Sequence, residues 1–175
     1  MRIRSAAVAA AAAASALGTL LVATPAQAVD TYNVTINIAD GYCLDIPNSH
    51  AVSNQVVQQW PCNGTDAQRW NILDFGASHF KIQSAAWPNY CLNNWSSGNT
   101  TGDYIKLYNC SSADSAFNTI GTDGGSNYIR FQPMRATSNC VNMWGGQVQG
   151  AVARLYPCSD DGPNARFRLW KSGEI

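Results

Sequence analysis

The sequence has little charge, one glutamate and two histidines. Charged residues make up 13% of the chain, and its acidic side chains are ten aspartates and Glu174. A glycosidase needs two carboxylates that flank one bond. Asp160 and Asp161 are adjacent but stand in a DDGP turn sequence, and neither His50 nor His79 has a recognisable nucleophile context. We therefore expect a protein that is not an enzyme.

Positive charge and metal-ligand motifs are also scarce. From residue 29 onward, 9 Lys and Arg stand against 11 Asp and Glu. No basic stripe is available for nucleic acid or for anionic lipid. The six cysteines include no C-x-x-C pair, and the histidines lack zinc-type spacing. The sequence thus predicts no nucleic-acid partner, no metal and no cofactor.

Long apolar runs are absent except near residue 1. Arg2 and Arg4 precede AAVAAAAAASALGTLLVA, and Ala26-Gln27-Ala28 follows. This order is typical of a secretory signal peptide over 1–28, with a retained membrane anchor as the alternative. No other stretch approaches the roughly 20 apolar residues of a membrane span. We expect a single secreted, extracellular domain over 29–175 without a membrane span.

The cysteines reveal an internal repeat. They stand at 43, 62, 91, 110, 140 and 158, so the separations within successive pairs are 19, 19 and 18, and the period is near 48. Cys43-Leu44-Asp45 matches Cys91-Leu92-Asn93 and Cys140-Val141-Asn142. A Q-R-W segment ending at Trp70 matches segments ending at Phe117 and Phe167. The repeat predicts three lobes, at about 32–76, 77–124 and 125–171.

Each lobe opens with residues that alternate between apolar and polar, as in YNVTINI, HFKIQ and NYIRFQ. Period-2 alternation is typical of half-buried strands. The segments are short and bounded by Gly, Asn, Pro and Ser, and no helical period is sustained after residue 28. The sequence therefore predicts an all-β domain with pseudo-threefold symmetry.

Cysteines of an exported chain are expected to form disulfides. Six cysteines allow fifteen pairings. The pairings that respect the repeat are few, and the local set is the simplest: Cys43–Cys62, Cys91–Cys110 and Cys140–Cys158. Each would close a loop of about 20 residues and stabilise the fold by roughly 3 kcal/mol.

The combination of C-L-D, Q-x-W-x-C and Q-x-W resembles the ricin B-type lectins, whose QxW repeats fold as β-trefoils. The resemblance covers the chain from residue 29 and implies twelve strands in three lobes. It also implies non-catalytic binding of glycans or polysaccharides in a shallow pocket on each lobe. Trp70, Phe117 and Phe167 would then form the core triplet, while Trp60, Tyr108 and Tyr156 would each present a ring to a sugar.

Lobe one carries the fullest predicted sugar site: Asp45, Gln58, Trp60 and Gln68. A sugar's C–H face packs on an aromatic ring. Its hydroxyls need acceptors, among which a carboxylate forms the stronger charge-assisted bonds. Asp45 could instead bond backbone amides, Gln68 could only brace a strand, and Trp60 could be covered.

The other lobes depart from this pattern. Lobe two has Asn93 and Tyr108, with Lys106 and Ser115 in place of the glutamines. Lobe three has Asn142, Tyr156 and Asn164, with Arg154 and Ala165 in those places. Lys106 and Arg154 could favour an acidic sugar or be solvated surface charges. Trp95 and Trp144 would extend the pockets if exposed and would be plugs if buried.

A second function remains open, since one fold can serve unrelated functions. The chain could be a protein-binding trefoil, either an inhibitor or a subunit of a secreted toxin or enzyme assembly. Two lobes without the carboxylate fit that reading, and a secreted protein would then be its partner. Binding to immobilised sugars would favour the lectin, and co-purification with an exported protein the alternative.

Overall fold

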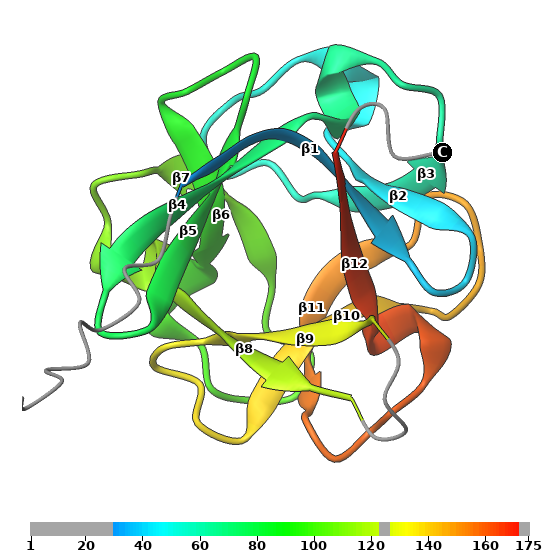
Figure 1. The fold of residues 1–175 in the computed structure, drawn as a ribbon. Coiled ribbons are helices and arrows are strands. Elements are labelled where there is room, and N and C mark those ends of the chain that lie inside the picture. The colour runs from blue at the N-terminus through cyan, green and yellow to red at the C-terminus, as the bar shows by residue number, and fades with distance from the viewer. Residues whose placement is uncertain (1–29, 123–126, 172–175) are drawn as a thin grey trace, which may run out of the picture.

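The computed structural model describes residues 30–122 and 127–171, so the predicted signal peptide over 1–28 lies outside the described residues. Twelve strands and five short 3-10 turns make up this part of the chain (Figure 1). The strands are β1 (Thr31–Ile38), β2 (Tyr42–Asp45), β3 (Gln58–Pro61), β4 (Trp70–Gly76), β5 (His79–Ser84), β6 (Tyr90–Asn94), β7 (Ile105–Asn109), β8 (Phe117–Gly121), β9 (Ile129–Pro133), β10 (Asn139–Trp144), β11 (Val152–Pro157) and β12 (Phe167–Lys171). The 3-10 turns are η1 (Pro47–Ser49), η2 (Asp66–Gln68), η3 (Trp95–Ser97), η4 (Ala113–Ser115) and η5 (Pro163–Ala165). No helix in these ranges is long and apolar enough to cross a membrane.

Six strands close into an antiparallel barrel. The ring runs β1–β4–β5–β8–β9–β12 and returns to β1. Within each lobe the first strand meets the aromatic that begins the fourth, in the pairs Val34–Trp70, Phe80–Phe117 and Ile129–Phe167. The sequence repeat therefore corresponds to the same pairing of first and fourth strands in each lobe.

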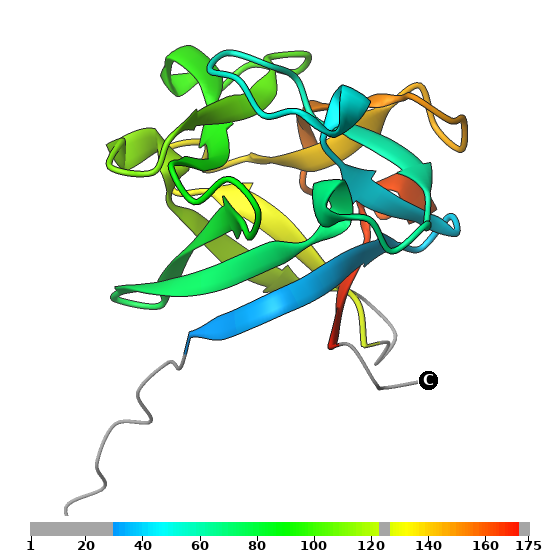
Figure 2. The same ribbon diagram turned by 90° about the horizontal axis from the view of Figure 1, so that it is seen from above.

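The other six strands form three hairpins, β2–β3, β6–β7 and β10–β11. The hairpins lie toward one end of the barrel, and β1 and β4 toward the other (Figure 2). Adjacent hairpins meet through single residue pairs: Val56 with Lys106, Tyr104 with Arg154, and Val152 with Gln58. Three such lobes around a closed barrel form a β-trefoil, which confirms the predicted fold.

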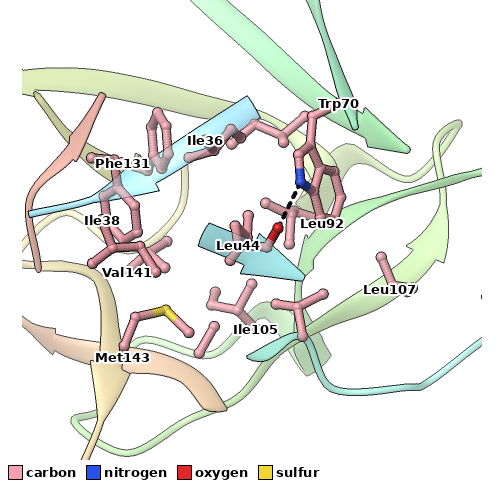
Figure 3. Packing of buried hydrophobic residues seen from close by; sticks show 14 of the residues in the cluster. Ile36, Ile38, Leu44, Trp70, Leu92, Ile105, Leu107, Phe131, Val141 and Met143 are labelled. Atoms are coloured by element: carbon pink, nitrogen blue, oxygen red, sulfur yellow. Dashed lines mark hydrogen bonds between the residues drawn. The ribbon is translucent and has the colours of Figure 1, made fainter. Parts of the chain in front are cut away.

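The core contains the predicted aromatic triplet. Trp70, Phe117 and Phe167 are each fully buried. The indole of Trp70 donates to the Leu44 carbonyl at 3.1 Å (Figure 3), so its one polar atom is satisfied. The ring of Phe167 stacks on Phe131 at 4.8 Å between centroids. Apolar residues from all three lobes join these rings in one buried cluster, so the lobes share a single core.

The three disulfides are the local ones that the repeat predicts. Cys43–Cys62, Cys91–Cys110 and Cys140–Cys158 each join the two sides of one hairpin. Each bond lies beside the strand positions that carry the predicted sugar-binding residues, because β2, β6 and β10 contain the first cysteine of each pair. The disulfides therefore hold the two walls of each candidate site together.

Candidate functional site

A turn after the second strand of each lobe shapes one wall of the site. It begins four residues after the first cysteine, with Pro47, Trp95 or Trp144. The next two residues have left-handed backbone in every lobe: Asn48 and Ser49, Ser96 and Ser97, Gly145 and Gly146. Non-glycine residues adopt this conformation rarely. Its recurrence at equivalent positions shows that the turn is a fixed part of the lobe.

In lobe one this turn and β3 enclose a pocket of about 270 Å³. Trp60, Asp45 and Gln58 line it, together with Asn63 and the turn residues. Trp60 is half-buried, so part of its ring is open to a ligand. Three of the four residues predicted for lobe one therefore face a common hollow.

Asp45 is buried and held by two glutamines. Its Oδ1 accepts from Gln58 Nε2 at 2.8 Å, and its Oδ2 accepts from Gln68 Nε2 at 3.2 Å. Burial raises the pKa of the carboxyl above its ordinary value of 3.8, and these two hydrogen bonds oppose the shift. Each carboxylate oxygen can accept a second bond, so Asp45 keeps acceptor capacity for a sugar hydroxyl.

Gln68 lies behind Asp45 and does not line the pocket. Gln68 is fully buried, and its Nε2 also donates to the Pro61 carbonyl at 3.0 Å. Its Oε1 accepts from the backbone N–H of Asn63 at 2.9 Å. Both donors of its amide are thus in use. This geometry fits the alternative in which Gln68 braces the site and orients the carboxylate.

Lobe three contains a second pocket, of about 230 Å³, whose lining includes two aromatic rings. Tyr156 and Trp144 are 37% and 38% exposed, and their rings meet edge to face at 5.9 Å. Trp144 therefore extends the pocket, as expected of an exposed ring. Asn142 and Asn164 line the interior, where Asn164 Nδ2 donates to Asn142 Oδ1 at 3.0 Å.

The carboxylate of lobe three comes from Asp160, which also lines the pocket. Asn142 Nδ2 donates to Asp160 Oδ2 at 3.4 Å, so the amide and the acid face each other. The loop that follows the second cysteine of the lobe is longer here than in lobe one. Ala165, at the end of η5, stands seven residues after Cys158, whereas Gln68, at the end of η2, stands six residues after Cys62. Asp160 lies in this longer loop, two residues after Cys158.

Neighbouring charges fix the loop that carries Asp160. Asp161 accepts two hydrogen bonds from Arg166, at 2.9 and 2.6 Å, and these hold its pKa below the ordinary value. Arg130 donates to the Cys158 carbonyl at 2.6 Å. A Cβ at Gly162 would lie 2.8 Å from Asn164 Oδ1. Glycine there leaves room for the Asn164 side chain.

Lobe two is arranged differently. Asn93 is buried, and its Nδ2 donates to Ser112 and Ser115 Oγ at 3.1 and 3.0 Å. Trp95 is half-buried and meets Tyr108 edge to face at 5.7 Å, while Tyr108 is 40% exposed. Asp114 accepts from Ser97 Oγ at 2.8 Å. Each lobe therefore places one carboxylate near its turn, but from a different strand or loop.

The predicted residues thus separate into three groups. Those that line a pocket are Asp45, Gln58, Trp60, Asn142, Tyr156 and Asn164. Gln68 and Asn93 are buried partners, and Tyr108 presents an exposed ring beside Trp95. The prediction missed Asp160, Asn63 and the η1 residues. The longer loop before Ala165 was the available signal for Asp160.

These pockets combine a flat apolar ring with fixed acceptors and donors. An aromatic face suits the C–H face of a pyranose. A carboxylate with neighbouring amides can accept from and donate to adjacent hydroxyls. Among the described residues, no group of three or more His, Cys, Asp or Glu side chains is placed to hold a metal ion. Each of the two pockets therefore has both an aromatic ring and polar side chains in its lining.

Fold and site together define a β-trefoil of the lectin type. The ricin-type beta-trefoil lectin domain-like family matches residues 21–108. A protein of Mycobacterium tuberculosis (strain H37Rv), itself uncharacterised, is 32% identical over 130 residues, which are 74% of this chain and 69% of that protein. The chain belongs to the ricin-type β-trefoil lectin family.

Solved structures with the same fold include natural and designed proteins. The designed threefold-symmetric protein ThreeFoil superposes with a TM-score of 0.69 at 20% identity, covering 80% of this chain and 97% of its own. The Macrolepiota procera ricin B-like lectin, solved in complex with lactose, gives 0.64 at 14% identity, covering 84% and 98%. These likenesses confirm the β-trefoil fold of the described part of the chain.

Proposed function

We propose that this chain is a secreted, non-catalytic carbohydrate-binding protein with sugar pockets in lobes one and three. The observation that carries the proposal is the same in both lobes: an accessible aromatic ring and a carboxylate line one hollow. In lobe one the pair is Trp60 and Asp45, and in lobe three it is Tyr156 and Asp160. The signal-like segment over 1–28 and the three disulfides support export.

The two pockets would hold a sugar in a similar way. The ring of Trp60 or Tyr156 stacks on the C–H face, while the carboxylate accepts hydrogen bonds from adjacent hydroxyls. In lobe one, Gln58 adds one free donor and an acceptor, because its Nε2 donates only to Asp45. In lobe three, Asn164 adds an acceptor alone, because its Nδ2 already donates to Asn142 and to the Met143 carbonyl. Lobe three has the more open aromatic surface because Trp144 stands beside Tyr156.

Two shallow sites on one rigid domain suit a repeating glycan better than a single sugar. One site should bind a monosaccharide near the millimolar range, or about −4 kcal/mol. A polymer that engages both sites gains apparent affinity without any new contact. The natural ligand is therefore expected to be a polysaccharide or a clustered glycan.

A glycan array with the secreted protein tests this function, followed by titration of the strongest ligands. Trp60→Ala and Tyr156→Ala should each weaken binding to a polymer, and the double variant should abolish it. Tyr108→Ala, which removes an exposed ring of lobe two, is the matched control and should change binding least. If the unaltered protein binds no glycan but co-purifies with an exported protein, the protein-binding alternative replaces this one.

A further inference from the structure

A row of alternating rings and cations crosses the junction between lobes two and three. It consists of Trp95, Lys106, Tyr104, Arg154 and Trp144, which we name the cation–aromatic row. Lys106 Nζ lies 4.7 Å from the Trp95 ring centre and 5.2 Å from that of Tyr104. The Arg154 guanidinium lies 4.0 Å from the Tyr104 ring centre and 5.3 Å from that of Trp144.

The strand pairing between hairpins creates this row. Val56, Tyr104 and Val152 occupy equivalent positions in the three lobes, as do Gln58, Lys106 and Arg154. All six are half-buried, and the residue after each cation is buried, so their side chains lie on the outer face of the strands. Tyr104 pairs with Arg154, whereas valines stand at the other two junctions. An aromatic platform between two cations is therefore particular to this junction.

Neither cation has an acidic partner among the described residues. The ion pairs in the described part of the chain join Arg130, Arg135 and Arg166 to aspartates. Neither Lys106 nor Arg154 takes part in one of them. Lys106 Nζ donates to the Asn54 amide oxygen at 2.7 Å, and Arg154 Nη2 donates to the Tyr104 hydroxyl at 2.5 Å. The Arg154 Nε is buried without a hydrogen-bond partner in the described part of the chain. Both cations are thus held by neutral and aromatic groups, without an ion pair among the described residues.

The row continues directly into the sugar pocket of lobe three. Trp144 belongs to both, since it stacks near Arg154 and lines the pocket with Tyr156 and Asp160. A saccharide seated there and extended over Trp144 would bring its next unit toward Arg154 and Tyr104. Guanidinium groups bind carboxylate and sulfate through two parallel hydrogen bonds.

We infer that the cation–aromatic row binds the acidic group of a saccharide, a carboxylate or a sulfate, next to the lobe-three pocket. This inference rests on the proposed function and specifies its ligand class as an acidic glycan. The net charge supplies no general attraction for anions, because from residue 29 onward 9 Lys and Arg stand against 11 Asp and Glu. The selectivity is therefore expected to be local and to depend on Lys106 and Arg154.

The experiment compares ligand pairs that share one sugar skeleton and differ in charge. Tetragalacturonate with its methyl ester tests a carboxylate, and 3-O-sulfolactose with lactose tests a sulfate. The same pairs are included in a glycan array, so that neutral binding is recorded independently. At least one acidic member should bind about tenfold more tightly than its neutral counterpart, as a hydrogen bond to a charged group can provide. Salt at about 0.5 M should weaken the acidic member and leave the neutral one unchanged.

The variants assign the preference to the row. Lys106→Gln with Arg154→Gln should remove the acidic preference and keep neutral binding, with the folded state checked by circular dichroism. Arg154→Lys keeps the charge but not the planar fork and should retain part of it. Lys171→Gln, at the end of β12, removes one positive charge elsewhere and should change nothing.

Three results would overturn the inference. Equal binding of acidic and neutral glycans refutes it alone and leaves the proposed function standing. If an oligonucleotide of the same charge binds as tightly as the acidic glycan, the row is a general anion site, and the inference is refuted. Absence of binding to every glycan, neutral or acidic, refutes the proposed function and this inference together.

Discussion

Asp160→Ala is the sharpest test of the lobe-three pocket, because Asp160 is the one carboxylate that lines it. Removing it deletes the acceptor that faces Asn142 Nδ2 at 3.4 Å. A hydrogen bond between a hydroxyl and a charged group contributes about 1.5–3 kcal/mol, so the affinity of lobe three should fall by roughly 10- to 150-fold. Isothermal titration in a Trp60→Ala background measures lobe three without lobe one.

Asp161→Ala is the matched control, since it removes the adjacent carboxylate that does not line the pocket. This change breaks the paired hydrogen bonds with Arg166 and should loosen the loop, yet its effect on affinity should be well below that of Asp160→Ala. Equal losses from both variants would refute a direct contact between Asp160 and sugar. Unchanged affinity after Asp160→Ala would move the lobe-three site away from this loop.

Further predictions concern lobe one, pH, the core and Gly162. Asp45→Ala or Trp60→Ala should each cost more than about 1 kcal/mol of binding at lobe one, measured in a Tyr156→Ala background; intact binding in both variants would exclude that lobe. Burial raises the pKa of Asp45, so the folded state favours the protonated carboxyl more than the unfolded state does. The protonated Asp45 therefore stabilises the fold below the unfolded pKa, and this contribution is lost as pH rises through the folded pKa. On acidification, lobe-one affinity should therefore fall at a pH above 3.8, before the circular dichroism changes, and the Asp45→Ala variant should lack this step. Phe117→Ala and Phe167→Ala should each lower the free energy of unfolding by roughly 3–5 kcal/mol, and Tyr108→Ala by much less; denaturant melts showing three equal losses would contradict the inward and outward assignment. Gly162→Ala should displace Asn164 and weaken lobe three while leaving lobe one unchanged, and equal affinity in that titration would mean that the Asn164 side chain is dispensable.

The fold could be predicted because its determinants recur in the sequence at a fixed period. The cysteine pairs and the residues Trp70, Phe117 and Phe167 stand at matching positions, and each pairs or packs in the same way in its lobe. Repetition makes a weak motif reliable, since three copies constrain one architecture. The inward direction of these three aromatics followed from that architecture, whereas the sequence left the direction of Trp95 and Trp144 open.

The candidate sites were less predictable because their polar groups do not follow the repeat. Position 45 carries the carboxylate of lobe one, but lobe two has Asp114 beside Ser97, and lobe three has Asp160 in a longer loop. Aligning the three lobes tests only the position equivalent to Asp45. A carboxylate supplied from another position in the lobe therefore escapes that comparison. Side-chain direction also mattered, as Gln68 shows by pointing behind Asp45 rather than into the pocket.

The disulfides have a consequence for how the molecule would respond to proteases. Each bond lies within one lobe, and the three account for all the cysteines. Cleavage in the turn between β4 and β5 would therefore leave no covalent link between lobe one and the rest, although the barrel hydrogen bonds and the shared core would still join them. Each fragment would keep its own hairpins closed. We therefore expect a trefoil built this way to stay assembled after a nick between lobes, and to release the fragment only when the shared core is denatured.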